Sequence, residues 1–246
     1  MLRTDRQDLQ AVQSLVLQPH RDDAVMNAAI LLLAGMIPLP AAIVSVFSRS
    51  SHLVRPLPAR SIREVSEIRK REDVLAWRGF PGVHLVDGMG FLDLPDRGPS
   101  SDGAFLTFQV ERAIQRLVVE LGITFLVVQY AARPDAHPDH QVVFRAAVRA
   151  VSELPNVSLL LTQDAPYSVM APGHAELLDL GYRRVHLPLS ARALGRKHRA
   201  MDDYVSQMRP GFHAFVDRNP WEALWLPTAQ HGMGGETYAH ALAALS

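Results

Sequence analysis

Short apolar runs alternate with longer amphipathic segments along most of this chain. The short runs have the length and branched composition of buried strands, whereas the longer segments show helical spacing. The pattern predicts strands at 14–17, 42–47, 83–85, 125–129 and 157–161, and helices at 23–33, 62–78, 104–121, 139–152 and 191–208. Because alternating strands and helices require crossover connections, we expect a doubly wound α/β fold with a mainly parallel sheet and helices on both faces.

The same pattern indicates one domain over residues 1–246. We expect its core at about 14–208 and a C-terminal extension at 209–246, which holds a Gly-Met-Gly-Gly turn. The turn-rich segment 93–102 is expected to be an exposed loop.

The segment 24–47 is almost uniformly apolar and is long enough to cross a bilayer. Pro38 and Pro40 interrupt it, and proline disfavours a continuous helix. The pattern therefore predicts a buried helix, a turn and a strand. We expect a protein without a membrane span and, since no signal pattern precedes this segment, a cytoplasmic one.

Composition narrows the possible partners and chemistry. The 246 residues carry 25 basic and 25 acidic side chains, and no basic block gives electrostatic support for binding nucleic acid. The chain has no cysteine, which excludes disulfides and a cysteine nucleophile. We expect a small-molecule substrate, and the composition is compatible with a homo-oligomer.

Two polar segments at the ends of predicted strands carry the candidate chemistry. The first is His20-Arg21-Asp22-Asp23, and the second is the run His137-Pro138-Asp139-His140. Carboxyl ends of parallel strands share one sheet edge, where this architecture binds ligands. Two histidines and one carboxylate leave a fourth zinc position open, as in hydrolytic sites. The spacing therefore favours an open metal site made by His20, Asp23 and His140.

Neighbouring residues suit supporting roles in such a site. Asp22 would lie close enough to take a proton from metal-bound water, and Asp139 is placed to orient one imidazole. Each segment alone also fits an ordinary helix start. The chain offers no Gly-x-Ser-x-Gly elbow, phosphate loop or clean dinucleotide fingerprint as a rival.

The paired segments resemble the LmbE-like/PIG-L family of zinc-dependent N-deacetylases, which includes N-acetylglucosaminyl-phosphatidylinositol deacetylase. The family's Pro/Ala-His-Pro-Asp-Asp-Glu motif is matched by the run from Pro19 to Ala24, and its His-Pro-Asp-His motif is matched without change from His137 to His140. Weaker similarities are Arg69-Lys70-Arg71-Glu72, Asp164-Ala165-Pro166-Tyr167, and Lys197 followed by Tyr204-Val205-Ser206-Gln207. The resemblance thus covers about residues 14–208.

The resemblance implies a Rossmann-like fold and a hydrolase that removes an N-acetyl group from an N-acetylglucosamine-type or related amino-sugar conjugate. It implies zinc ligands His20, Asp23 and His140, with Asp22 as the general base. It further implies that His137 stabilises the oxyanion or protonates the leaving amine, with Asp139 orienting His137.

Two positions depart from the family motif, and several further positions are candidate substrate contacts. Arg21 replaces a proline and could act on Asp22, while Ala24 replaces a glutamate whose loss can weaken metal binding. The candidate substrate contacts are Arg69, Arg49, Asp93 and Tyr130. The alternatives are a solvated loop for Arg49, a turn-forming role for Asp93 and core packing for Tyr130.

Other functions stay open at this point. The chain could be a non-catalytic or weakly active member that binds a metal and a sugar-like ligand, or a metal hydrolase of another amide or ester. Iron(II), cobalt or manganese would suit the same ligands as zinc.

Overall fold

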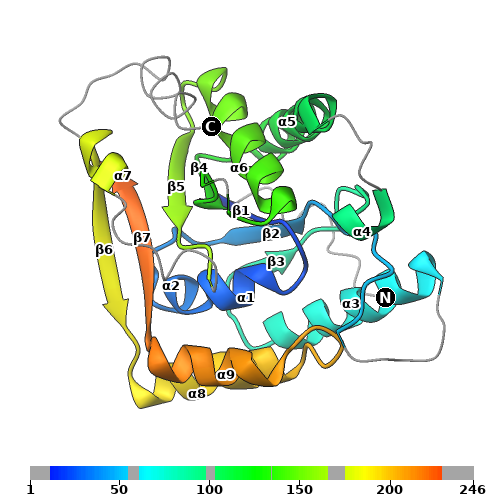
Figure 1. Ribbon diagram of the computed structural model, residues 1–246. Coiled ribbons are helices and arrows are strands. Elements are labelled where there is room, and N and C mark those ends of the chain that lie inside the picture. The colour runs from blue at the N-terminus through cyan, green and yellow to red at the C-terminus, as the bar shows by residue number, and fades with distance from the viewer. Residues whose placement is uncertain (1–11, 55–60, 98–102, 134, 166–174, 229–246) are drawn as a thin grey trace.

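A twisted sheet of seven strands runs through the molecule, in the order β3-β2-β1-β4-β5-β7-β6 (Figure 1). The computed structural model describes residues 12–54, 61–97, 103–133, 135–165 and 175–228. The strands are β1 (Ser14–Gln18), β2 (Ala41–Ser45), β3 (Val83–Leu85), β4 (Phe125–Gln129), β5 (Ser158–Thr162), β6 (Tyr182–Pro188) and β7 (Trp221–Pro227). Strands β1 to β5 are parallel, and β7 pairs antiparallel with both β5 and β6. The expected doubly wound, mainly parallel sheet is confirmed.

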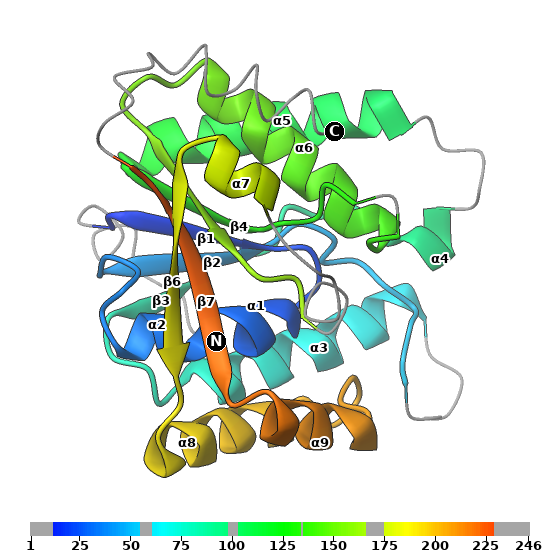
Figure 2. The same cartoon turned by 60° about the vertical axis from the view of Figure 1, so that its left-hand side comes forward.

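Helices cover both faces of this sheet, as Figures 1 and 2 show. They are α1 (Asp23–Asn27), α2 (Ala29–Leu33), α3 (Ile62–Trp77), α4 (Leu94–Arg97), α5 (Gly103–Leu121), α6 (Pro138–Ser152), α7 (Ala175–Asp179), α8 (Ala191–Asp202) and α9 (Pro210–Arg218). Side chains of α5 and α6 form one core with one sheet face, and side chains of α1, α2, α3, α8 and α9 form a second core with the other. Within β1, Leu15 and Leu17 join the first core while Val16 joins the second. Burial on both faces explains why these strands read as continuous apolar runs.

The helix expected over 23–33 is divided at Ala28 into α1 and α2. An uninterrupted helix would pair the Met26 carbonyl with the Ile30 amide. Instead, Lys197 Nζ donates to the Met26 carbonyl over 2.6 Å, and Glu222 Oε2 accepts from the Ile30 amide over 3.0 Å. Lys197 and Glu222 also contact each other at 2.7 Å. This ion pair, which we call the Lys197–Glu222 wedge, inserts into the helix ladder and accounts for the break.

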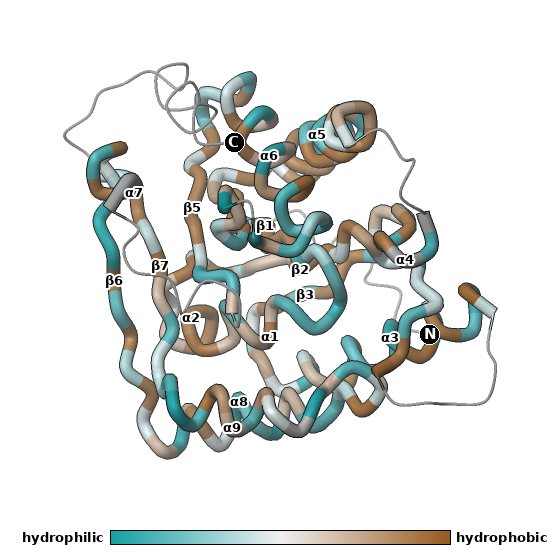
Figure 3. Tube along the Cα trace, viewed as in Figure 1, coloured by the Kyte–Doolittle hydropathy of each residue, from teal (hydrophilic) through white to brown (hydrophobic). Residues whose placement is uncertain are grey.

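Residues beyond 208 contribute to the sheet itself. We expected the core to end near residue 208, but β7 lies between β5 and β6, and α9 packs on the second core. In β6 the polar residues Arg183, Arg184 and His186 break up the apolar run, and the acidic Glu222 does so in β7, so neither segment reads as a continuous apolar strand in the sequence. Figure 3 shows this mixed character in β6 beside the apolar interior of β5.

Other boundaries also differ from the prediction. The helix expected over 191–208 ends at Asp202, and the loop expected over 93–102 contains α4. Residues 98–102 of that loop lie outside the described part of the chain. Among the described helices, none is both long and apolar enough to cross a membrane.

The strand order creates a switch point between β1 and β4. From β1 the chain proceeds to β2 and β3 on one side, and β4 and β5 then extend the sheet on the other. Open α/β sheets bind ligands at such a point, beyond the carboxyl ends of the strands. The first polar segment follows β1 and the second follows β4, so both lie at this crevice.

Candidate metal centre

Three side-chain atoms form a nearly equilateral triangle above β1 and β4. His140 Nε2 lies 3.3 Å from His20 Nδ1 and 3.3 Å from Asp23 Oδ2, and the latter two atoms are 3.4 Å apart. Ligand bonds of 2.0–2.1 Å in a tetrahedral zinc site give a ligand–ligand distance of about 3.3–3.4 Å. The donor set and its spacing therefore fit one face of a four-coordinate divalent metal site.

Local hydrogen bonds hold the first two of these residues in place. The turn after β1 closes because the Asp23 carboxylate accepts the His20 amide over 2.7 Å and the Asp23 amide donates to the His20 carbonyl over 3.2 Å. Asn27, one turn further along, ties this helix to the loop after β5, since its side-chain oxygen accepts from the Ala165 amide over 2.8 Å. The ligand-bearing turn is thus fixed from both sides.

A buried carboxylate contacts the outer nitrogen of each imidazole in the triangle. Asp139 Oδ2 lies 3.0 Å from His20 Nε2, and Asp164 Oδ1 lies 2.7 Å from His140 Nδ1. Such carboxylates fix the tautomer of a ligating histidine and leave the other nitrogen's lone pair for the metal. The Asp139 carboxylate therefore orients His20, whereas the backbone amide of Asp139 donates to His137, the residue that we expected Asp139 to orient.

The electrostatics of the triangle favour a positive charge at its centre. Burial alone would lower the pKa of His140, but Asp23 and Asp164 outweigh burial and raise it well above its usual value. Burial likewise opposes the charged form of His20, but the hydrogen bonds that its ring donates to the Asp139 and Asp23 carboxylates raise its pKa. The pKa of Asp23 lies well below its usual value because the two histidines overcome the effect of burial. Protons and metal ions would compete for this centre.

His137 lies beside the triangle and caps the first turn of α6. Its Nδ1 accepts the Asp139 amide over 3.2 Å, so the neutral imidazole carries its hydrogen on Nε2. Burial, with the nearby His20 and His140, lowers the pKa of His137 to about 4. One donor atom from each of the three histidines lies within 4.8 Å of the others. The triangle with Asp23 is more compact, with sides of 3.3–3.4 Å.

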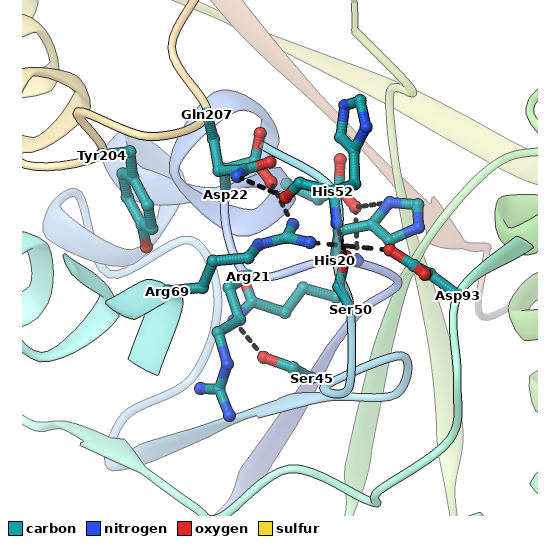
Figure 4. Close-up of polar contacts among 12 residues, drawn as sticks. His20, Arg21, Asp22, Ser45, Ser50, His52, Arg69, Asp93, Tyr204 and Gln207 are labelled. Atoms are coloured by element: carbon teal, nitrogen blue, oxygen red, sulfur yellow. Dashed lines mark hydrogen bonds and ion pairs between the residues drawn. The ribbon is translucent and has the colours of Figure 1, made fainter. Parts of the chain in front are cut away.

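Asp22 and Arg69 form the next layer of the site (Figure 4). Asp22 Oδ1 lies 3.4 Å from the Arg69 guanidinium, which also approaches Asp93 Oδ2 at 3.7 Å. Arg69 is only 3% exposed, so α3 holds it rigidly between the two carboxylates. Asp22 therefore faces the site with its carboxylate fixed by an ion pair.

These residues border a cavity of about 240 Å³. It is lined by His20, Asp22, Asp23, Met26, His52, Val54, Arg69, Asp93, His137, His140, Ala165, Gln207, Arg209 and Phe212. Arg69 and Asp93 thus lie where a substrate could reach them. Arg49 and Tyr130 are not among the lining residues: Arg49 is exposed in a strand-like bridge to Leu92, and Tyr130 is buried against Phe144. The structure places both away from the cavity, contrary to our expectation.

Arg21 and Ala24, the two positions that depart from the family motif, both lie in the protein interior. Arg21 donates to Asp73 on α3 over 3.0 Å and is 6% exposed, and Figure 4 shows it directed away from Asp22. Asp73 also accepts from Tyr204 over 2.6 Å. Arg21 thus anchors the turn that carries His20 and Asp23 to α3, and it does not make the approach to Asp22 that its position in the sequence allowed. Ala24 is buried in the second core.

Two of the segments with weaker similarity to the family motifs contact each other in the folded protein. Glu72 on α3 accepts from the backbone and hydroxyl of Ser206 over 2.7 and 2.6 Å. The adjacent Gln207 lines the cavity and donates to the His52 carbonyl over 3.2 Å. The segment after α8 is therefore docked on α3 and forms one wall of the cavity.

Sequence reasoning missed Asp164 as part of the site. It lies two residues after β5, at the same sheet edge as the two metal motifs, and this position is the signal that could have identified it. A second clue in the sequence is the short stretch Asp164-Ala165-Pro166-Tyr167, of which the last two residues lie outside the described part of the chain.

Comparison with known proteins finds a family and a relative that are both described as deacetylases. Residues 15–151 match the family described as GlcNAc-PI de-N-acetylase, PIG-L. The chain is 30% identical over 177 residues to 2′-N-acetylparomamine deacetylase of Streptomyces fradiae, a match that covers 68% of this chain and 61% of that protein.

Solved structures share the fold. A deacetylase of the teicoplanin biosynthesis pathway superposes with a TM-score of 0.68 at 24% identity, over 89% of this chain and all of that one. A 4-carboxy-2-hydroxymuconate hydratase from Pseudomonas putida does so with a TM-score of 0.59 at 14% identity, over 91% of this chain and 100% of its own. Since a hydratase shares the fold, the fold alone does not specify the reaction.

Proposed function

The chain belongs to the GlcNAc-PI de-N-acetylase (PIG-L) family, and from this membership we propose that it is a zinc-dependent N-deacetylase of amino-sugar conjugates. The observation that carries the proposal is the triangle of His20 Nδ1, Asp23 Oδ2 and His140 Nε2, with sides of 3.3–3.4 Å, at the cavity. The substrate class rests on the relative from S. fradiae, which is named as a deacetylase of 2′-N-acetylparomamine.

His20, Asp23 and His140 would hold the metal ion. A divalent ion bound there would supply Lewis acidity, polarising the amide carbonyl and lowering the pKa of a water molecule. Asp139 and Asp164 keep the two imidazoles in the tautomers that this binding requires.

Asp22 would act as the general base. It lines the cavity next to the ligand Asp23, and its ion pair with Arg69 fixes the position of its carboxylate. It accepts a proton from the water that attacks the amide carbon, and it can deliver that proton to the departing nitrogen. The second hydrogen of the water stays on the new carboxyl group, so amide and water give acetic acid and a free amine, which then become acetate and an ammonium group by proton transfer.

His137 would stabilise the negative charge that develops on the carbonyl oxygen. The Asp139 amide donates to its Nδ1, so a neutral His137 carries its hydrogen on Nε2, and the side chain lines the cavity. A pKa of about 4 keeps this imidazole neutral near pH 7, which favours hydrogen-bond donation over transfer of a proton to the amine. Donors in comparable positions contribute about 10²–10³-fold to kcat.

The test compares Asp22→Asn, His140→Ala and the control Asp87→Asn, which changes an exposed carboxylate that pairs with Lys70. We expect Asp22→Asn to keep its zinc but lose acetate release, and His140→Ala to lose both. Asp87→Asn should keep both. The proposal fails if Asp22→Asn and His140→Ala release acetate like the parent protein.

The substrate class is tested with a panel of N-acetylated amino sugars, free and conjugated, beside simple acetamides and acetate esters. Turnover of amino-sugar conjugates above the other compounds supports the proposal. Turnover of esters or unrelated amides alone would indicate a different hydrolase, and zinc binding without any turnover would indicate a binding protein.

A further inference from the structure

A second histidine pair lies outside the cavity, where α8 meets α9. His198 Nδ1 and His213 Nδ1 are 2.6 Å apart, and their rings are nearly parallel, with centroids separated by 4.8 Å. His198 comes from α8 and His213 from α9, and both side chains are partly exposed.

A carboxylate contacts the outer nitrogen of each ring. His198 Nε2 lies 3.0 Å from Asp217 Oδ1, and His213 Nε2 lies 3.3 Å from Asp202 Oδ1. A carboxylate accepts hydrogen bonds, so each Nε2 carries a hydrogen, and each Nδ1 of a neutral ring then presents a lone pair. Two lone pairs facing each other at 2.6 Å repel unless a cation lies between them.

The arrangement repeats the design of the candidate metal centre. There too, each imidazole has a carboxylate on its outer nitrogen and directs its inner nitrogen toward a shared point. Carboxylate–histidine pairs of this kind are typical of metal-ligating histidines. Imidazole nitrogens suit zinc, nickel and copper.

The geometry needs only a small adjustment to bind such an ion. With metal–nitrogen bonds of about 2.0–2.1 Å, adjacent ligands lie about 2.9 Å apart at a right angle, as in octahedral coordination, and about 3.3–3.4 Å apart in a tetrahedral site. The two nitrogens would therefore separate by about 0.3 Å for an octahedral ion and by about 0.7–0.8 Å for a tetrahedral one, which partly exposed side chains on two helices can accommodate. Water would fill the remaining positions, since the site is open to solvent.

We propose that His198 and His213, supported by Asp217 and Asp202, form a second cation site that takes a divalent transition metal such as Zn²⁺ or Ni²⁺. The ion would join α8 to α9. Phe212, next to His213, lines the main cavity, so the second site lies close to one of its walls. The inference does not depend on the proposed deacetylase activity.

The test uses the full chain with His20→Ala and His140→Ala, which removes two ligands of the main centre. Calorimetric titration with Zn²⁺ is expected to show one equivalent bound in this background. Adding His213→Ala should abolish that binding, and adding Asp217→Asn should weaken it about 10-fold or more. His186→Ala is the control, because His186 stacks on Trp221.

A second experiment compares the parent protein with His198→Ala, so that the main centre keeps all of its residues. The parent protein should bind two equivalents of Zn²⁺, and His198→Ala should bind one. The proposal is overturned if the background variant binds no zinc, if His213→Ala does not change its binding, or if His198→Ala leaves the stoichiometry of the parent protein unchanged. If a shared proton is the only cation that fits between His198 and His213, the background variant will bind no zinc.

Discussion

Replacement of Asp164 by asparagine tests how strongly the outer carboxylates control the metal centre. Asp164 contacts His140 Nδ1 at 2.7 Å, and its side chain is only 1% exposed. Asparagine has nearly the same size and retains an acceptor oxygen, so the substitution removes the negative charge with little change in packing. The affinity for the metal should fall because His140 becomes a weaker donor.

The structure also predicts how much metal affinity Asp164→Asn loses compared with Asp139→Asn. Losing a carboxylate behind a ligating histidine costs about 10–100-fold in metal affinity, or about 1.4–2.7 kcal/mol. Asp164 should be near the upper limit, since its pair with His140 is short and buried. Asp139→Asn should be near the lower limit, because the Asp139–His20 contact is 3.0 Å long and His20 is 15% exposed.

The assay is competition for Zn²⁺ with a chelator of known affinity, at one pH and with the metal-free protein. Asp135→Asn is the matched control, since Asp135 is an exposed aspartate that pairs with Arg133. The reasoning is refuted if Asp164→Asn binds zinc as tightly as the control. Equal losses for Asp164→Asn and Asp139→Asn would refute the ranking by distance and burial.

Four further predictions follow from the site and the core. His137→Ala should lower kcat about 10²–10³-fold. The pH profile between 6 and 9 should keep its shape, because a pKa of about 4 keeps this imidazole neutral throughout that range. The loss of a titration step between pH 6 and 9 would contradict this prediction. Arg69→Ala should lower kcat/KM while zinc content stays constant, and a loss of zinc would show that Arg69 supports the ligands instead. Tyr130→Phe should leave KM unchanged, since Tyr130 lies in the core, and a raised KM would place it at the substrate. Lys197→Met should cost about 3–5 kcal/mol in urea unfolding, because it leaves Glu222 buried without its cation, and a cost below about 1 kcal/mol would contradict this.

The central parallel strands and the metal motifs could be predicted because their signals are local. Strands β1 and β4 are buried on both faces, and a continuous apolar run is the direct consequence. The motifs follow these strands without interruption, so their meeting at one sheet edge follows from parallel topology alone.

Two of the failures depend on contacts between distant segments. The break at Ala28 is produced by Lys197 and Glu222, which lie far along the chain from α1. The partner of Asp139 depends on the approach of β1 to β4, which brings His20 closer than sequence neighbours suggest. The local sequence pattern does not reveal such contacts, because each residue type at these positions also suits an ordinary helix or loop.

The Lys197–Glu222 wedge has a consequence for the order in which the protein can mature during synthesis. Both metal motifs leave the ribosome early, within the segment 15–151 that matches the family. Glu222, which accepts the amides at the start of α2, emerges after about seventy further residues. A nascent chain that ends before β7 therefore has all three ligand residues but lacks the carboxylate that shapes the helix behind Asp23. Metal capture in its final geometry is expected to be one of the last steps of assembly.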